Sequence, residues 1–245
     1  MKTVDVNCPK SLDLKNIVKT KESASILQTV DVFDKVAITS YLRGMPGIFI
    51  KSSEELDDAL KNDIKMIVDL FLKYINISVS NLEINIEKNR LNLTNNYYNI
   101  LAGILIGLNI YFQNSLHKHE LIYLGSTINN LIGYYIECGY KKIDIDNRYS
   151  SIGENNYYKY IILEDLKKEE LLRIKNKLIE INKEHVIADF NNEYFFIALS
   201  RNLVFKYNLS NLPIKLKKEF NNVKVTITSN VNENKVLVRY LNNFE

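Results

Sequence analysis

Apolar and polar residues alternate with a period of two along several segments, which is the pattern of half-buried strands. The clearest segment is Leu82–Ile86, where every second residue is leucine or isoleucine. Residues 223–228 and 235–241 also alternate and are expected to form a hairpin across Ser229–Asn234. Further strands are expected at residues 3–7, at 26–39 as two strands bent around Asp34 and Lys35, at 194–199 and at 203–207.

Other segments repeat apolar residues every three or four positions and therefore predict helices. Residues 52–75 are the clearest case, with Ser52 and Glu55 as a capping box at the start. Residues 97–112 are almost uncharged and contain Gly103 and Gly107, so we expect an apolar helix there. Further helices are expected at residues 115–135, capped by Ser115, at the strongly charged stretch 164–183, and at 212–220.

Helices and strands follow one another in mixed order, which predicts an α+β fold. The most loop-like stretch of the chain is Ser150–Tyr158. We therefore expect an N-terminal domain over residues 1–150 and an α+β C-terminal domain over residues 151–245. The second domain is expected to combine antiparallel strands with helices.

The composition indicates which class of protein this is, which partners it lacks and in which compartment it works. The 46% of hydrophobic and 25% of charged residues are typical of a soluble globular chain. The net charge of +3 comes without a dense basic cluster, so we expect no nucleic-acid binding. The longest apolar run, Ile100–Tyr111, is too short to span a bilayer, so we expect no membrane insertion. Two cysteines, Cys8 and Cys138, and an N-terminus without an apolar leader favour the cytoplasm.

The stretch Leu82–Phe112 carries candidate chemistry, because a strand that leads into a helix through a short bend is a common phosphate-binding element. The first N–H groups of the helix have no partner within the helix and can bind an anion. Such a bend usually needs glycine, yet residues 90–98 contain none. A second candidate, the pair His117 and His119, lacks the further clustered ligands of a zinc site, so we expect no metal.

Four segments occur in an order that resembles one enzyme superfamily. Residues 28–34, QTVDVFD, resemble the motif QTIDLYD, and residues 84–89, INIEKN, resemble I-x-I-x-K-N. Residues 107–109, GLN, and 121–128, LIYLGSTI, resemble ALN and LAELGAKI. These motifs resemble the GHMP kinases, most closely the 4-diphosphocytidyl-2-C-methyl-D-erythritol kinases of isoprenoid biosynthesis. The resemblance covers residues 3–140. It implies an N-terminal ribosomal-protein-S5-domain-2-like half and a C-terminal half with an antiparallel sheet and helices.

The resemblance also implies where functional residues should lie. The family's glycine-rich ATP loop falls on residues 91–102, where only Thr94, Asn95 and Asn96 remain as vestigial phosphate ligands. The catalytic aspartate falls on Leu131, which cannot accept a proton. Lys10 matches the lysine of the A-K-I-N-L motif and is the one functional residue retained.

Two further family motifs have changed in this sequence. The G-Y-H-E-L segment falls near residues 19–23, where Thr20 and Lys21 replace the aromatic residue and the histidine. The C-terminal glycine-rich loop falls near residues 229–234, which contain no glycine.

We therefore expect a degenerate GHMP-type kinase, a pseudokinase that needs no cofactor and acts as a non-catalytic binding or structural protein. Its expected partner is another protein or a second copy, with a small-molecule ligand in the remaining cleft also allowed. The alternative is a divergent ATP- and Mg-dependent small-molecule kinase that uses Lys10, Thr94 and the Asn-rich bend. A third hypothesis is an unrelated α+β interaction module. An open cleft between Lys10, the bend and Leu131 would favour ligand binding, whereas a cleft filled by Tyr97 or Tyr98 would favour protein contacts.

Overall fold

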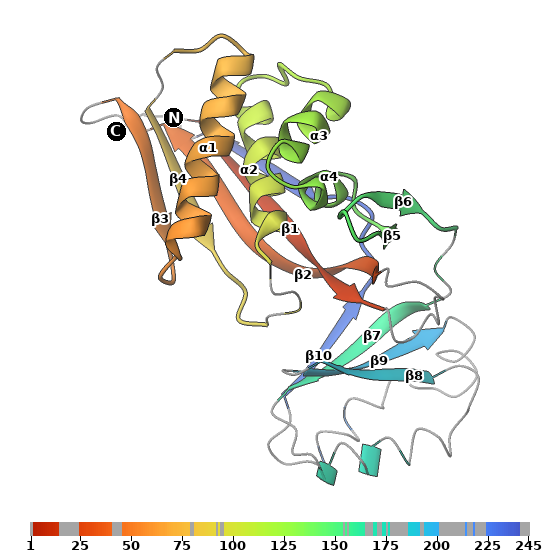
Figure 1. Ribbon diagram of the computed structural model, residues 1–245. Coiled ribbons are helices and arrows are strands. Elements are labelled where there is room, and N and C mark those ends of the chain that lie inside the picture. Colours follow the sequence, from red (N-terminus) through yellow and green to blue (C-terminus); the bar gives the residue numbers. More distant parts are fainter. Residues whose placement is uncertain are drawn as a thin grey trace.

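Two β-sheets and a layer of helices form the part of the chain that the structure, a computed structural model, describes (Figure 1). The first sheet has seven strands and the second has four. This mixed architecture confirms the predicted α+β class. The described residues are 2–14, 25–40, 46–78, 81–91, 93, 96–153, 155, 157–164, 169–170, 173–174, 176, 186–191, 194–200, 214, 218 and 224–240.

The first sheet has the strand order β11-β1-β2-β4-β3, with β5 paired to β2 and β6 paired to β5. Helices α1 to α4 cover one of its faces (Figure 1). The strands are β1 (Lys2–Asp13), β2 (Ser25–Ser40), β3 (Gly47–Ser52), β4 (Asn81–Glu87), β5 (Tyr140–Ile143), β6 (Tyr149–Ser151) and β11 (Lys235–Tyr240). The helices are α1 (Asp58–Tyr74), α2 (Tyr98–Tyr111), α3 (Lys118–Ser126) and α4 (Asn130–Glu137).

The second sheet is antiparallel, with the order β10-β7-β9-β8. A buried apolar cluster joins it to the first sheet, because Tyr160 and Ile162 of β7 pack in one group with Leu12 and Val30. The strands are β7 (Tyr157–Glu164), β8 (Val186–Asn191), β9 (Tyr194–Ser200) and β10 (Lys224–Ser229). Strand β8 was not predicted, whereas the predicted segments 203–207 and 212–220 and most of 164–183 lie outside the described residues.

The predicted bend at Asp34 and Lys35 is wrong, because β2 is one continuous strand of 16 residues. Its first residues pair with β5 and its last residues pair with β4. It stays paired with β1 along nearly its whole length, and the irregularity is a register shift between Pro9 and Lys10. The sequence indicated a break, but long-range pairing on both sides keeps the strand extended.

Two predicted helix starts are corrected by the structure. Helix α1 begins at Asp58, because the carboxylate of Asp57 accepts a hydrogen bond from the Leu60 amide at 2.6 Å, and Ser52 belongs to β3. The single helix expected at residues 115–135 is two helices, α3 and α4. The side chain of Asn129 caps the second one by accepting from the Leu131 amide at 2.9 Å.

The predicted hairpin of residues 223–228 and 235–241 is also wrong. Strand β10 pairs with β7 in the second sheet, whereas β11 pairs with β1 in the first. The segment between them therefore crosses from one sheet to the other. It is held at Thr29, whose carbonyl accepts from the Val231 amide at 3.0 Å.

Helix α2 packs directly against the centre of the first sheet, and its two glycines face β1 and β2. A methyl group on Gly103 would lie 2.1 Å from Cys8 Sγ, and one on Gly107 would lie 2.7 Å from Ile38 Cδ1. Both distances are shorter than atoms can approach. The glycines are therefore required by the close contact of the helix with the sheet.

Candidate functional site

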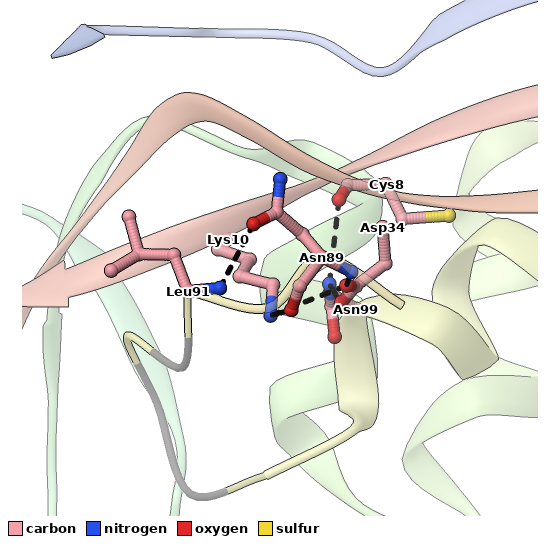
Figure 2. A network of polar contacts seen from close by, with 6 residues as sticks. All are labelled: Cys8, Lys10, Asp34, Asn89, Leu91 and Asn99. Carbon is pink, nitrogen blue, oxygen red and sulfur yellow. Dashed lines mark hydrogen bonds and ion pairs between the residues drawn. The ribbon is translucent and has the colours of Figure 1, made fainter. Parts of the chain in front are cut away.

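Lys10 lies in β1 just after the register shift, and its charge is inside the protein. Its Nζ lies 3.2 Å from Asp34 Oδ1 and donates to the Asn89 carbonyl oxygen at 3.1 Å (Figure 2). The Lys10 and Asp34 side chains are only 9% and 5% exposed. A buried ammonium needs such oxygen partners, because burial of an unpaired charge is very costly.

Asp34 is the centre of this buried network and gathers donors from three elements. Besides Lys10, it accepts from the Asn89 amide at 2.7 Å and from Asn99 Nδ2 at 2.8 Å. Asn99 also donates to the Cys8 carbonyl oxygen at 3.3 Å. The network therefore joins β1, β2, the exit of β4 and the first turn of α2 (Figure 2).

The first turn of α2 is where a phosphate would bind in the predicted element. Asn96 accepts from the Tyr98 amide at 3.4 Å, so its side chain already satisfies one of the terminal N–H groups. Thr94 and Asn95 lie outside the described residues.

The two tyrosines of this turn make contacts with neighbouring helices. The Tyr97 hydroxyl donates to Asp63 of α1 at 3.0 Å, and the Tyr98 hydroxyl accepts from Asn129 at 3.1 Å. Their ring centroids are 5.5 Å apart. Burial, together with the hydrogen bond to Asp63, raises the pKa of Tyr97 to about 12, so its hydroxyl stays protonated.

Leu131 stands in the first turn of α4 and is 8% exposed. It belongs to the main hydrophobic core, where it packs instead of titrating. Among the described residues, the polar partners of Lys10 are Asp34 and Asn89, and neither Asn96 nor Leu131 takes part in that network. The structure thus brings Lys10 together with Asp34 and Asn89, and not with the described site residues Asn96 and Leu131.

Sequence reasoning missed Asp34, Asn89 and Asn99 as members of one site. A signal was present for Asp34, because it occupies the same strand face as the buried residues Val32 and Val36. A carboxylate on the core face of a strand needs a buried partner. Asn99, a polar residue in an apolar helix, was the corresponding signal on α2.

No family model matches this sequence, and no curated protein matches it. Solved structures do match its fold. The mevalonate pyrophosphate decarboxylase from Streptococcus pyogenes has a TM-score of 0.63 and 10% sequence identity, over 95% of this chain and 96% of that one. The homoserine kinase from Cytophaga hutchinsonii has a TM-score of 0.61 and 12% identity, over 96% and 97%. The mevalonate diphosphate decarboxylase from Staphylococcus aureus has a TM-score of 0.60 and 10% identity, over 97% and 98%.

The chain has the GHMP-kinase fold. The predicted fold class is therefore confirmed, and the hypothesis of an unrelated α+β module is not. Structural similarity at such low sequence identity establishes the fold of the chain and leaves its activity open.

In this GHMP-kinase fold, a shallow pocket of about 340 Å³ opens beside the exit of β4. Its lining includes Asn89, Leu91, Asp31, Phe33 and Thr226. Lys10 is not in its lining, because its amine is directed to Asp34. The pocket therefore offers amide, carboxylate and aromatic groups and the side chain of Lys35, but not the Lys10 amine.

The described cysteines and histidines are Cys8, Cys138, His117 and His119. Burial raises the pKa of the Cys8 thiol, and raises that of Cys138 to about 12, so both stay protonated. The rings of His117 and His119 stack at the start of α3. Within the described ranges, no three His, Cys, Asp or Glu residues are placed to hold a metal ion. No helix in that part of the chain is long and apolar enough to cross a bilayer.

Proposed function

We propose that this chain is a degenerate GHMP-type kinase that lacks kinase activity and acts as a non-catalytic binding or structural protein. The observation that carries the proposal is the state of Lys10, the one residue that matches a functional residue of the family. Its amine is held in a buried ion pair with Asp34 and a hydrogen bond to Asn89. Because the charge is already compensated by these oxygens and the side chain is 9% exposed, the amine is poorly placed to bind a phosphate.

Two other observations support the loss of phosphoryl transfer. The core residue Leu131 occupies the position that the family resemblance gives to the catalytic aspartate, so no carboxylate there can take a proton from a substrate. The bend before α2 has no glycine, and its described residue Asn96 already binds the backbone of Tyr98. Both changes remove parts that phosphoryl transfer needs for positioning and charge stabilisation.

Within the superfamily, we infer descent from a protein like the 4-diphosphocytidyl-2-C-methyl-D-erythritol kinases, on the motifs at residues 28–34 and 84–89. The proposed protein works in the cytoplasm without ATP, Mg²⁺ or another cofactor. Its partner is a protein or a second copy, and not nucleic acid or a membrane.

The pocket beside Asn89 and Leu91 favours a second candidate, a divergent ATP-dependent small-molecule kinase. It opens at the end of the strand that leads into the phosphate bend in the predicted element. This candidate requires ATP to bind there with Mg²⁺, and Thr94 and the Asn-rich bend to replace the glycine-rich loop.

Thermal unfolding with and without Mg-ATP separates the two candidates. A nucleotide present at 100 times its Kd would stabilise the protein by about 2.7 kcal/mol and raise the Tm by about 5 °C or more. We expect no shift with millimolar Mg-ATP, whereas an active homoserine kinase measured in parallel should shift. A rise in Tm that saturates with ATP, together with phosphoryl transfer to a small alcohol, would overturn the proposal.

A further inference from the structure

The pocket beside Asn89 has an apolar part that is built from both sheets. Its lining includes Val32 and Leu91, which belong to the buried cluster between the sheets, and also Phe33 and Ile227. Ile227 of β10 is 55% exposed. An apolar group that enters the pocket would cover this isoleucine and remove it from water, which favours binding. The pocket therefore suits a ligand with an apolar body.

The neutral polar groups of the pocket can donate hydrogen bonds to a ligand. Asn89 Oδ1 accepts from the Leu91 amide at 2.9 Å, which leaves Asn89 Nδ2 free to donate. Figure 2 shows this nitrogen turned away from the Lys10 amine. Within the described part of the chain, the side chains of Asn7 and Thr226 have no hydrogen-bond partner, although both line the pocket. These groups favour a ligand that carries acceptor oxygens.

Positive charge gathers at one end of the pocket. Lys35 of β2 and Lys235 of β11 are paired with Asn7 of β1 from its two sides, so the three side chains share one face of the sheet. The Lys235 amine lies 5.2 Å from the centre of the Phe33 ring. Lys35 lines the pocket, and its ion pair with Glu87 is weak because both side chains are more than half exposed. Two amines are therefore available near this end.

Asp31 is the one carboxylate among the described lining residues, and its oxygens are already occupied. It accepts from the Thr228 hydroxyl and from the amide and hydroxyl of Ser229, at 2.8 and 3.1 Å for the last two. These donors stabilise its charge. Asp31, Phe33 and Lys35 occupy alternate positions of β2, so they share a face at intervals of about 7 Å. The pocket thus runs from an amine at one end to a saturated carboxylate at the other.

We propose that this pocket binds a small organic carboxylate with a flat apolar body, of the size of an aromatic acid. The carboxylate lies at the Lys35 end, where the Lys35 amine and the Asn7 amide donate to it. The ring lies against Phe33 and Ile227, and a hydroxyl at its far end bonds to Thr226. A volume of about 340 Å³ is at the lower end for small-molecule sites and is sufficient for such an acid.

Charge distinguishes this ligand from a nucleotide. The pocket lining contains one amine, with a second nearby, which match a single carboxylate. A triphosphate carries several negative charges and needs more cations or a metal ion. The inference rests on the proposed binding function and names the class of ligand.

Titration with 4-hydroxybenzoate, followed by nuclear magnetic resonance of the full chain, tests this proposal. We expect saturable shifts with a Kd on the order of 1 mM, as is usual for a ligand of this size. The uncharged 4-hydroxybenzamide and the ringless acetate should each bind at least about fivefold more weakly, because each lacks one of the two recognised parts. No saturable shift, or an amide that binds as tightly as the acid, would overturn the proposal.

Three variants locate the binding site. Lys35→Met removes the charged donor and should weaken binding of 4-hydroxybenzoate about tenfold. Lys51→Met is the matched control, because Lys51 forms an ion pair with Glu83, is 62% exposed and does not line the pocket. It should leave the Kd unchanged. Glu87→Gln releases the Lys35 amine and should tighten binding about two- to fivefold. Equal losses in the two methionine variants, or weaker binding in Glu87→Gln, would contradict the assigned site.

The titrations contain neither ATP nor Mg²⁺, so they are independent of the test for nucleotide binding. Failure of the carboxylate to bind overturns the ligand and leaves the proposed lack of kinase activity untouched. A rise in Tm with Mg-ATP, together with phosphoryl transfer, overturns the lack of kinase activity whatever the affinity for the carboxylate.

Discussion

Lys10 carries its charge into the interior of the molecule, where two protein oxygens replace water. Its partner Asp34 has two further donors, from Asn89 and Asn99. A buried ion pair is seldom more stable than an apolar pair of the same volume, but removal of one partner leaves the other charge without compensation. The network therefore makes Lys10 and Asp34 depend on each other for stability.

We expect the Lys10→Met substitution to lower the free energy of unfolding by about 3 kcal/mol, because Asp34 keeps its charge without a cation beside it. Urea unfolding followed by circular dichroism measures the change. Lys35→Met is the matched control, since Lys35 forms an ion pair with Glu87 in which both side chains are more than half exposed. Its effect should stay below about 1 kcal/mol. A Lys10→Met protein as stable as the wild type would show that the pair is dispensable.

At the scale of elements, the packing of α2 on the first sheet requires a very close approach of the helix to the strands. Gly103 lies against Cys8 of β1, and Gly107 lies against Ile38 of β2. Alanine would favour a helix by about 1 kcal/mol at either position, but its methyl group has no space here. Packing against the sheet therefore outweighs local helix propensity.

The Gly103→Ala substitution should lower the free energy of unfolding by about 1–3 kcal/mol, because the added methyl group collides with Cys8 Sγ. Chemical denaturation measures this loss. Adding Cys8→Ala removes the colliding sulfur and should restore part of the stability, so that the two changes are not additive. Gly47→Ala is the control, because a methyl group there meets Phe49 at an ordinary 3.8 Å. Simple additivity of the two substitutions would argue against the collision.

At the scale of the whole molecule, Thr29 joins three segments that are far apart in sequence. Its hydroxyl accepts from the Gly139 amide at 2.6 Å and donates to the Val231 carbonyl oxygen. Its own amide donates to the Gly139 carbonyl oxygen. These bonds tie β2 to the turn after α4 and to the segment that crosses from β10 to β11.

We expect Thr29→Val to lower the free energy of unfolding by about 2 kcal/mol, because the buried Gly139 N–H and Val231 C=O lose the hydroxyl that they bind. The substitution keeps the volume of the side chain, so no cavity contributes to the loss. Guanidinium unfolding measures the loss. Thr39→Val is the control, since the Thr39 hydroxyl bonds to Thr3 at a half-buried position, and it should cost less than half as much. Equal effects at the two positions would show that the hydrogen bonds of the Thr29 hydroxyl contribute no more to stability than those of Thr39.

The sequence by itself determined the elements whose pattern is local. The alternating segment Leu82–Ile86 forms β4, and the apolar stretch 97–112 forms α2. Both could be predicted because the spacing of apolar residues along a short segment indicates its secondary structure and its buried face. The sequence also showed that the bend before α2 lacks glycine and that Leu131 cannot act as a base. The order of motifs was sufficient to predict the GHMP-kinase-like α+β fold.

Only the tertiary structure decided which distant residues meet. The alternation in β10 and β11 fitted a hairpin. In the structure, however, β10 pairs with β7, and β11 pairs with Lys2–Asn7 of β1. A period of two states which face of a strand is buried and not which strand lies beside it. In the same way, Lys10 matched a family motif, but its pairing with Asp34 depends on the register of β1 and β2, which long-range contacts fix.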